Sequence, residues 1–370
     1  MITIFLNLFP GLPHTTRGRW KSGLLWFLLF SVHAFIFGLG IYRGRMVFVS
    51  KEAAVLPSVV AILFLVATWI LSFVHFNSAQ AEDSGRGFSY WDIVKRKFFR
   101  DKKGITGAII VMIMVYMALF APFLATDDPI EMNYSNSLAP PYINHPLGTD
   151  NYGRDIFSRI VFGSRVALGI GAGATLFNMV FGGFLGLIAG FYKGIMDSLV
   201  MRLLEIINSI PFLVLAILVV SVFGSSPLTL IVVLGIFGLY PARIIRSEVL
   251  SVREEEYISA AQAVGAGDFR VLFRHVLPNA MASLLVVTTM RIGVNIIIVA
   301  GLSFLGLGIN PPTPSWGAML QQAQEYIRIG WWMAIWPGLA IFLTVLGFNL
   351  LGDSFRDVLD PKLSKTSLQE

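Results

Sequence analysis

The chain has 370 residues, of which 55% are apolar and only 14% are charged. Soluble domains carry about 25% charged residues, so this composition excludes an ordinary soluble fold. The net charge of +6 does not indicate a nucleic-acid partner, because the basic residues fall between long apolar runs, as they do in the loops of membrane proteins. The chain contains no cysteine, which excludes disulfides, thiolate metal sites and cysteine nucleophiles.

Eight apolar runs are long enough to predict membrane-spanning helices. A helix needs about 20 apolar residues to cross the roughly 30 Å hydrocarbon core of a bilayer. We therefore expect an all-α polytopic membrane protein in which two N-terminal spans precede a six-span core. In chain order, the predicted spans cover residues 23–41, 55–76, 105–125, 166–191, 198–223, 227–245, 280–301 and 336–352.

A polar and basic stretch over residues 77–104 divides the chain. Its second half sets apolar side chains beside Lys95, Arg96 and Lys97, which is typical of an amphipathic helix at a membrane surface, although an ordinary basic flank before a span has the same pattern. The predicted order is a two-span extension with a polar linker, an amphipathic helix with the first core span and a loop, the rest of the core, and a tail. These segments cover residues 1–90, 91–165, 166–361 and 362–370.

The distribution of Lys and Arg predicts the orientation of the chain. With the N-terminus in the cytoplasm, the cytoplasmic loops hold most of the Lys and Arg outside the spans, and such loops are typically enriched in these residues. We therefore expect a multi-pass protein of the cytoplasmic (inner) membrane with both termini in the cytoplasm. The hairpin that carries Arg43, Arg45 and Lys51 runs against this rule in the first two spans.

Motifs for catalysis are absent from the sequence. It contains no G-x-x-x-x-G-K-[ST] loop for nucleotide phosphates, no H-E-x-x-H zinc motif and no G-x-S-x-G nucleophile motif. Asp127 and Asp128 precede Pro129, which is more typical of a turn than of a metal site. We therefore expect neither enzymatic activity nor a bound cofactor or metal in this chain.

Residues 254–279 form a long, patterned connector between two predicted spans. Acidic residues at its start favour the first turn of a helix, so a slim helix is predicted over residues 256–264, and Gly265 is expected to end it. Asp268 is expected to cap a second helix, and Pro278 then leads into the next span. The pattern indicates a helix–turn–helix on the cytoplasmic surface that docks a partner, although a plain connector is the alternative.

The stretch Y-I-S-A-A-Q-A-V-G-A and the following H-V-L-P-N resemble the "EAA" coupling loop of ABC importer permeases. In that family, the first short helix sits in a cleft of a separate ATPase subunit, which binds ATP and Mg. Ser259 stands where the family usually has glutamate, which leaves open the side chain that makes the charged contact. The acids at 254–256 lie nearby but are not in register with the family's glutamate. The resemblance maps onto Ala260, Ala261, Gly265, Leu277 and Pro278, and Glu256 and Ser259 complete the predicted ATPase-coupling set.

Three further segments resemble the oligopeptide, dipeptide and nickel group of these permeases. They are H-P-L-G-T-D-N-Y-G-R-D from His145, L-S-F-L-G-L-G-I-N-P-P-T-P-S-W-G from Leu302, and N-L-L-G-D-S-F-R-D from Asn349. The resemblance covers residues 91–361 and implies a sister permease, two ATPase subunits and an external substrate-binding protein as partners. It implies a peptide substrate, with a nickel complex or an oligosaccharide as alternatives.

An ion-driven secondary transporter is the rival class. That class predicts acidic residues at mid-membrane depth, whereas Glu205 is the only acid within reach of a predicted span. Arg291 and Asn295 also lie inside a predicted span. A cation in lipid costs at least about 2.5 kcal/mol, so these two residues are expected to face protein or water, and we predict that they line the pathway.

The loop over residues 145–159 faces outward in the family arrangement, where the binding protein docks. Its charged residues are expected to make that contact, because opposite charges suit reversible association, but an internally salt-bridged turn is an equal alternative. Glycines recur over 169–190 and predict close helix packing, within the chain or against the sister permease. Trp316 is expected at the membrane interface. The charged loop residues assigned to docking are Asp150, Arg154, Asp155 and Arg159.

Overall fold

The computed structural model describes residues 31, 94 and 97–359, and every regular element in this part of the chain is helical. The chain divides into two compact units, one of which comprises residues 94–118 together with residues from 126 onward. Residues 119–125 belong to the other unit. Apart from residue 31, the predicted spans 23–41 and 55–76 and the predicted tail 362–370 lie outside the described residues.

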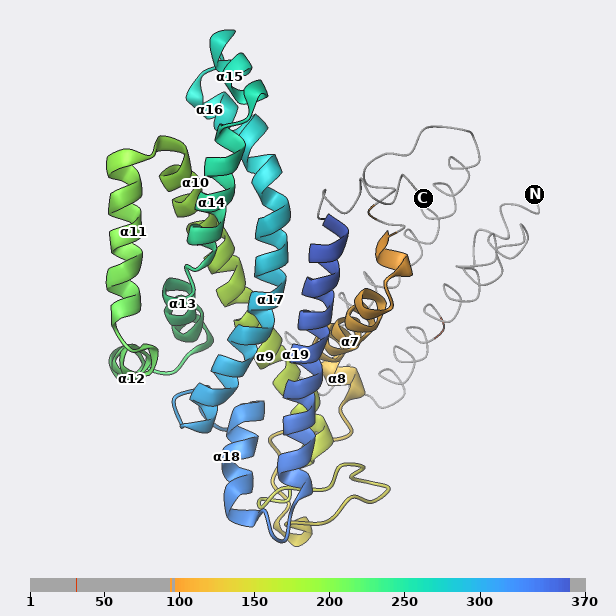
Figure 1. Ribbon diagram of the computed structural model, residues 1–370. Helices are drawn as coiled ribbons and strands as arrows, with labels where there is room; N and C mark the ends of the chain where they lie inside the picture. Colours follow the sequence, from red (N-terminus) through yellow and green to blue (C-terminus); the bar gives the residue numbers. More distant parts are fainter. Residues whose placement is uncertain (1–30, 32–93, 95–96, 360–370) are drawn as a thin grey trace, which may run out of the picture. The chain divides into compact units, whose positions relative to one another are not determined.

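The elements of the described part follow one another with short connections, apart from the long loop before α9 (Figure 1). In chain order they are α7 (Lys102–Leu119), α8 (Ala121–Leu124), the 3₁₀ turn η1 (Tyr134–Asn136), α9 (Ile156–Phe177), the π-helix η2 (Asn178–Gly182), α10 (Gly183–Tyr192), α11 (Gly194–Ser209), α12 (Phe212–Phe223), α13 (Pro227–Phe237), α14 (Pro241–Arg253), α15 (Glu256–Ala263), α16 (Asp268–Val271), the π-helix η3 (Leu272–Val276), α17 (Leu277–Phe304), α18 (Trp316–Tyr326) and α19 (Trp332–Leu359).

Four helices of the described residues are long and apolar enough to cross a membrane, and up to six spans result if two bent helix pairs each count as one. The four are α7, the continuous helix from α9 to α10, the continuous helix from α16 to α17, and α19. The bent pairs are α11–α12, with an angle of 82°, and α13–α14, with an angle of 42°. The predicted all-α polytopic membrane fold is confirmed, and these six segments coincide with the six predicted core spans.

The segments predicted as spans over 198–223 and 227–245 are each bent, which hydropathy alone does not predict. The first breaks at Ile210, which is extended (φ −85°, ψ 127°) and precedes Pro211. A proline disfavours helical geometry in the residue before it, so the chain turns there and restarts as α12. The second helix ends at Gly238 and restarts with Pro241 as the first residue of α14.

Close packing within the chain explains part of the glycine stripe. A Cβ atom at Gly186 would lie 2.3 Å from the carbonyl oxygen of Ala242, and one at Gly190 would lie 2.8 Å from that of Arg246. The backbones of α10 and α14 therefore approach each other as only glycine allows. By contrast, no described atom lies within 4 Å of a Cβ atom at Gly169.

The functional elements lie at opposite ends of the unit. Figure 1 shows α15 and α16 at one end, and α18 with the loop before α9 at the other. An apolar core that includes Ile258, Val271 and Val276 joins α15 and α16 to α10, α14 and α17. A second core, which includes Trp316 and Trp332, holds the opposite end together. Each end is thus supported by an apolar core of its own.

Candidate functional site

α15 is a short helix with a well-defined end. The N–H of Gly265 donates to the carbonyl of Gln262 at 2.9 Å, and the N–H of Ala266 donates to that of Ala261 at 3.0 Å. This pair of bonds requires positive φ at the residue after the cap, and Gly265 has φ +89°. The predicted slim helix and its glycine stop are therefore confirmed.

One face of α15 is buried and the other is open. Ile258 is only 1% exposed and packs into the apolar core below the helix. Val264 follows Ala261 and Ile258 at three-residue spacing, but it is 90% exposed because the helix has already ended there. Among the residues assigned to ATPase coupling, Ala261 and Leu277 are half-buried. The exposed ones are Glu256, Ser259, Ala260, Gly265 and Pro278.

α16 begins differently from the prediction. Asp268 is the first helical residue and Gly267 takes the cap position, so the capping role predicted for Asp268 is wrong. A glycine with extended backbone at this position leaves the aspartate inside the first turn, where its charge still suits the helix dipole. Next to it, Phe269 is 75% exposed, and its ring centroid lies 4.4 Å from that of Phe273. The end of the unit thus presents an aromatic pair beside α15.

Tyr257 ties α15 to the start of α17. Its hydroxyl oxygen accepts a hydrogen bond from Asn279 Nδ2 at 3.1 Å. Burial, and secondarily the carboxylate of Glu255, raises the pKa of Tyr257, so the phenol keeps its proton at neutral pH. The contact links the first turn of α15 to the helix that continues from Pro278.

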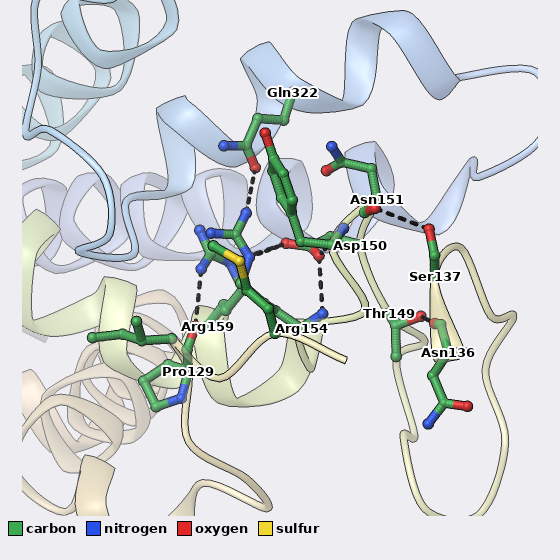
Figure 2. Close-up of polar contacts among 12 residues, drawn as sticks. Pro129, Asn136, Ser137, Thr149, Asp150, Asn151, Arg154, Arg159 and Gln322 are labelled. Carbon is green, nitrogen blue, oxygen red and sulfur yellow. Dashed lines mark hydrogen bonds and ion pairs between the residues drawn. The ribbon is translucent and has the colours of Figure 1, made fainter. Parts of the chain in front are cut away.

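At the opposite end, the charged residues of the loop before α9 bond to one another. Figure 2 shows Asp150 beside Arg154 and Arg159. Asp150 Oδ2 accepts a hydrogen bond from Arg154 Nε at 2.7 Å and lies 3.6 Å from Arg159 Nε. Arg154 Nη2 also donates to Gln322 Oε1 of α18 at 3.1 Å, and Arg159 Nη1 donates to the carbonyl of Pro129 at 2.9 Å.

The burial of these groups corrects the docking assignment. Asp150, Arg154, Asp155 and Arg159 are each no more than 3% exposed. Their side chains therefore do not reach the surface at which another protein would dock. Buried charges need partners inside the fold, and these four find them there, which favours the alternative of an internally bonded turn.

Asp155 also fixes the start of α9. One oxygen of its carboxylate accepts a hydrogen bond from the N–H of Ser158 at 2.7 Å, as a helix cap does. The other lies 2.9 Å from Nδ1 of His145. Asp127, His145 and Asp155 place one potential ligand atom each within 4.8 Å of one another, a spacing that a metal ion requires. The cap and the His145 contact already account for Asp155, so the group by itself indicates a folded turn.

Two buried tryptophans join this loop to the helices. Trp332 Nε1 donates to the carbonyl of Thr149 at 3.0 Å, and Trp316 Nε1 donates to that of Ile160 at 3.0 Å. Trp316 was expected to lie at the membrane interface, but the residue is 2% exposed and packs inside the protein, so it presents no face to lipid. Its ring leaves room only for a glycine at position 163. A Cβ atom at Gly163 would lie 2.7 Å from Trp316 Cδ1.

Asn295 belongs to a buried polar network between helices. Its Nδ2 donates to Thr175 Oγ1 at 2.9 Å and lies 3.5 Å from Asn178 Oδ1. The Nδ2 of Asn178 donates in turn to the carbonyls of Leu234 and Gly235, at 3.3 and 2.6 Å, at the end of α13. Asn295 is 2% exposed, so the geometry supports a link among α9, α13 and α17 in place of the predicted pathway-lining role.

Arg291 is half-buried, and its guanidinium carbon lies 5.0 Å from the ring centroid of Tyr240. This cation–π contact satisfies the expectation that the cation faces protein, and its place along the pathway remains a proposal.

Sequence reasoning missed Asn178, although an amide inside the apolar run 166–191 is a usable signal, because polar groups in a span are costly. Asn178 also begins the π-helix η2, a type of irregularity that is frequent at functional sites.

Comparison with known proteins identifies the family. Residues 182–365 match the family described as "binding-protein-dependent transport system inner membrane component", and residues 89–141 match the "N-terminal TM domain of oligopeptide transport permease C". The chain is 41% identical to the dipeptide transport system permease protein of Alkalihalophilus pseudofirmus, over 78% of this chain and 95% of that relative. The chain belongs to this family of ABC importer permeases.

Other relatives agree with this membership. The glutathione transport system permease proteins of Pectobacterium atrosepticum and of Escherichia coli are each 42% identical to this permease, over 74% of its length and 91% of theirs. These relatives are named as permeases, as expected for a transport subunit. The family predicted from the coupling segment and the three further segments is therefore confirmed.

Proposed function

We propose that this permease is the transmembrane subunit of an importer that moves peptides into the cytoplasm, and that separate ATPase subunits drive it through α15. The observation that carries the proposal is the form of α15. It is a short helix with small exposed residues on one side, and Ile258 on the other side is buried in an apolar core. Family membership supports the class of transporter. A sister permease, two ATPase subunits that bind ATP and Mg, and an external binding protein complete the proposed assembly.

The open side of α15 suits insertion into a cleft. Ser259 and Ala260 are exposed and small, so a partner can approach the helix backbone closely. Because Ser259 carries no charge, the attachment rests on shape, on apolar contacts, and on Glu256 one turn away. Val264, which caps α15, and Phe269 of α16 add exposed apolar surface at the same end of the unit, and such surface marks protein-interaction sites.

The proposal places the α15–α16 end in the cytoplasm, which the distribution of Lys and Arg supports. The loop before α9 then faces outward and meets the external binding protein. Its buried ion pairs keep the loop folded, while the contact is made by residues such as Tyr134 and Ile143, which are 67% and 97% exposed.

The names of the relatives support a peptide substrate. One relative is named for dipeptide transport and others for glutathione transport. Glutathione is a tripeptide, so both names describe short peptides. We therefore propose short peptides as the substrate class, to be checked by uptake of labelled dipeptides and glutathione into vesicles that contain the assembly. Absence of uptake of both would contradict this part of the proposal.

A bulky substitution at Ala260 tests the docking. Ala260 is exposed, so Ala260→Trp leaves the fold intact but blocks the cleft, and we expect the ATPase that co-purifies with the permease to fall about tenfold, as at other interface centres. Ala260→Ser is the conservative control. Gln324→Trp adds the same bulk at an exposed position of α18, at the opposite end, and should have no effect. Unchanged ATPase with Ala260→Trp would show that α15 does not dock it.

A further inference from the structure

A bidentate ion pair ties the start of α11 to α14. Arg246 donates Nε and Nη2 to the two carboxylate oxygens of Asp197, each at 2.5 Å. The pair is partly shielded, with 33% of the Arg246 side chain and 19% of the Asp197 side chain exposed. A two-pronged bond of this kind fixes orientation as well as distance and is among the stronger polar contacts in proteins.

Most other side chains of α11 are exposed or only half-buried. Within the described part of the chain, Leu204 is the one buried residue of this 16-residue helix, and it packs with Leu239 and Ala242 near the start of α14. Val200 and Met201 are half-buried and pack with Leu204, so the apolar contacts of α11 begin in its second turn, whereas the ion pair is made in its first turn. The outer face of α11 is apolar and exposed, through Ile195, Met196, Leu199, Leu203 and Ile206.

α14, in contrast, is firmly held and leads directly into α15. Its backbone packs against that of α10, and Arg253 at its end donates to the carbonyl of Phe191. Only Glu254 and Glu255 separate α14 from α15. In Figure 1, α11 begins at the end of the unit that carries α15. The ion pair therefore joins α11 to the helix that leads directly into α15.

We propose that the Asp197–Arg246 pair is the positioning contact that transmits movement of α15 to the bent span α11–α12 during transport. This inference rests on the proposed function, in which an ATPase subunit moves α15. α11–α12 is suited to respond, because it is bent by 82° at the break before α12 and each of its two helices has one fully buried residue, Leu204 in α11 and Ala216 in α12. Transmission is measured as the amount of peptide moved per ATP hydrolysed. A variant that only lowers the amount of folded protein reduces uptake and hydrolysis together and leaves this ratio unchanged.

Charge reversal tests the contact. D197R and R246D each place two like charges together, whereas the double variant D197R/R246D restores an ion pair with reversed polarity. In vesicles that contain the full assembly, we expect each single variant to keep its ATPase subunits but to move about tenfold less dipeptide per ATP, a usual size for coupling between sites. The double variant should recover most of the loss.

A neighbouring ion pair supplies the matched control. Lys193 Nζ lies 3.6 Å from Glu254 Oε1, but these side chains are 43% and 75% exposed. Exposed pairs contribute little, so K193E should leave the ratio of uptake to hydrolysis unchanged. If D197R yields too little folded assembly, D197N removes the charge with little change of shape and should lower the same ratio.

The outcomes separate this inference from the proposed function. If ATPase subunits accompany the wild-type permease but the single variants keep the wild-type ratio, the transmission role is wrong while the docking stands. Loss of uptake and hydrolysis in equal proportion, or a double variant no better than the single ones, would also overturn it, because the pair would then only support folding. If no ATPase subunit accompanies the wild type, the proposed function fails and the inference fails with it.

Discussion

The two ends of this permease use polar residues in opposite ways. In the loop before α9, Asp150, Arg154 and Arg159 are buried and satisfy one another. In α15, Glu256 and Ser259 are exposed, and the buried residue is the apolar Ile258. The first arrangement makes a rigid frame, because buried charges are costly to separate, and the second leaves a surface free for a partner. Substitutions at the first end should therefore lower stability, and those at the second should lower binding.

The largest loss of stability is expected from Asp150→Ala. The substitution leaves Arg154 and Arg159 buried without their carboxylate, and removal of one partner from a buried ion pair costs about 3–5 kcal/mol. Thermal unfolding of the purified permease should show a much lower midpoint. Asp128→Ala removes an exposed carboxylate from the same loop and is the control. Equal midpoints for the two variants would contradict the rigid-frame interpretation.

Two glycines of α9 give the next comparison. Gly163→Ala would bring its Cβ atom within 2.7 Å of Trp316, and overpacking of this kind costs about 1–3 kcal/mol. Gly169→Ala meets no described atom within 4 Å, so it should be neutral or slightly stabilising, because alanine favours helices. The same unfolding measurement distinguishes them. A Gly163→Ala variant as stable as Gly169→Ala would show that Trp316 does not require the close approach.

Asn178→Leu should have a smaller effect. It removes the hydrogen bonds to the carbonyls of Leu234 and Gly235, and hydrogen bonds between helices in membranes contribute about 1 kcal/mol or less each. Thr344→Val is the matched control, because the buried Thr344 hydroxyl bonds to the carbonyl of Ala340 in its own helix. A shift of the unfolding midpoint no larger than that of Thr344→Val would argue against a clamp between helices.

The smallest change in stability is expected from Val264→Asp. Val264 is 90% exposed, and surface substitutions usually change the free energy of unfolding by less than about 0.5 kcal/mol. The same variant should lose most of the co-purifying ATPase, because it places a charge on the apolar side of the docking face. A large loss of stability with full ATPase binding would reverse the proposed division between the two ends.

Local signals in the sequence predict α15 well and the bends of the helices poorly. Gly265 supplies a turn that depends on neighbouring residues alone, so the end of α15 follows from the sequence. The break at Ile210 also has a local signal in Pro211, but the apolar run continues through it, and hydropathy alone favours one span. Val264 shows the same limit, because its spacing matches that of the buried Ile258, yet the helix ends before it and the side chain is exposed.

The burial of the loop charges depends on contacts distant in sequence. Arg154 is satisfied partly by Gln322, which lies 168 residues further along, and Trp332 holds Thr149 over a similar separation. Opposite charges on a loop are equally consistent with a wet interface and with an internal network, so the sequence alone leaves both open. The Asn178–Asn295 contact is likewise visible only once α9 and α17 are side by side.

The central claim is that the α15–α16 end receives the ATPase, and the absence of cysteine from the sequence allows a direct test. Val264→Cys and Ile143→Cys each introduce a single thiol, at positions that are 90% and 97% exposed at opposite ends of the unit. In the purified assembly, we expect Val264→Cys to be protected from a maleimide and to become reactive when the ATPase subunits are removed. Ile143→Cys should react equally in both preparations, provided that the external binding protein is left out of each. Equal reactivity of Val264→Cys with and without the ATPase would contradict the claim.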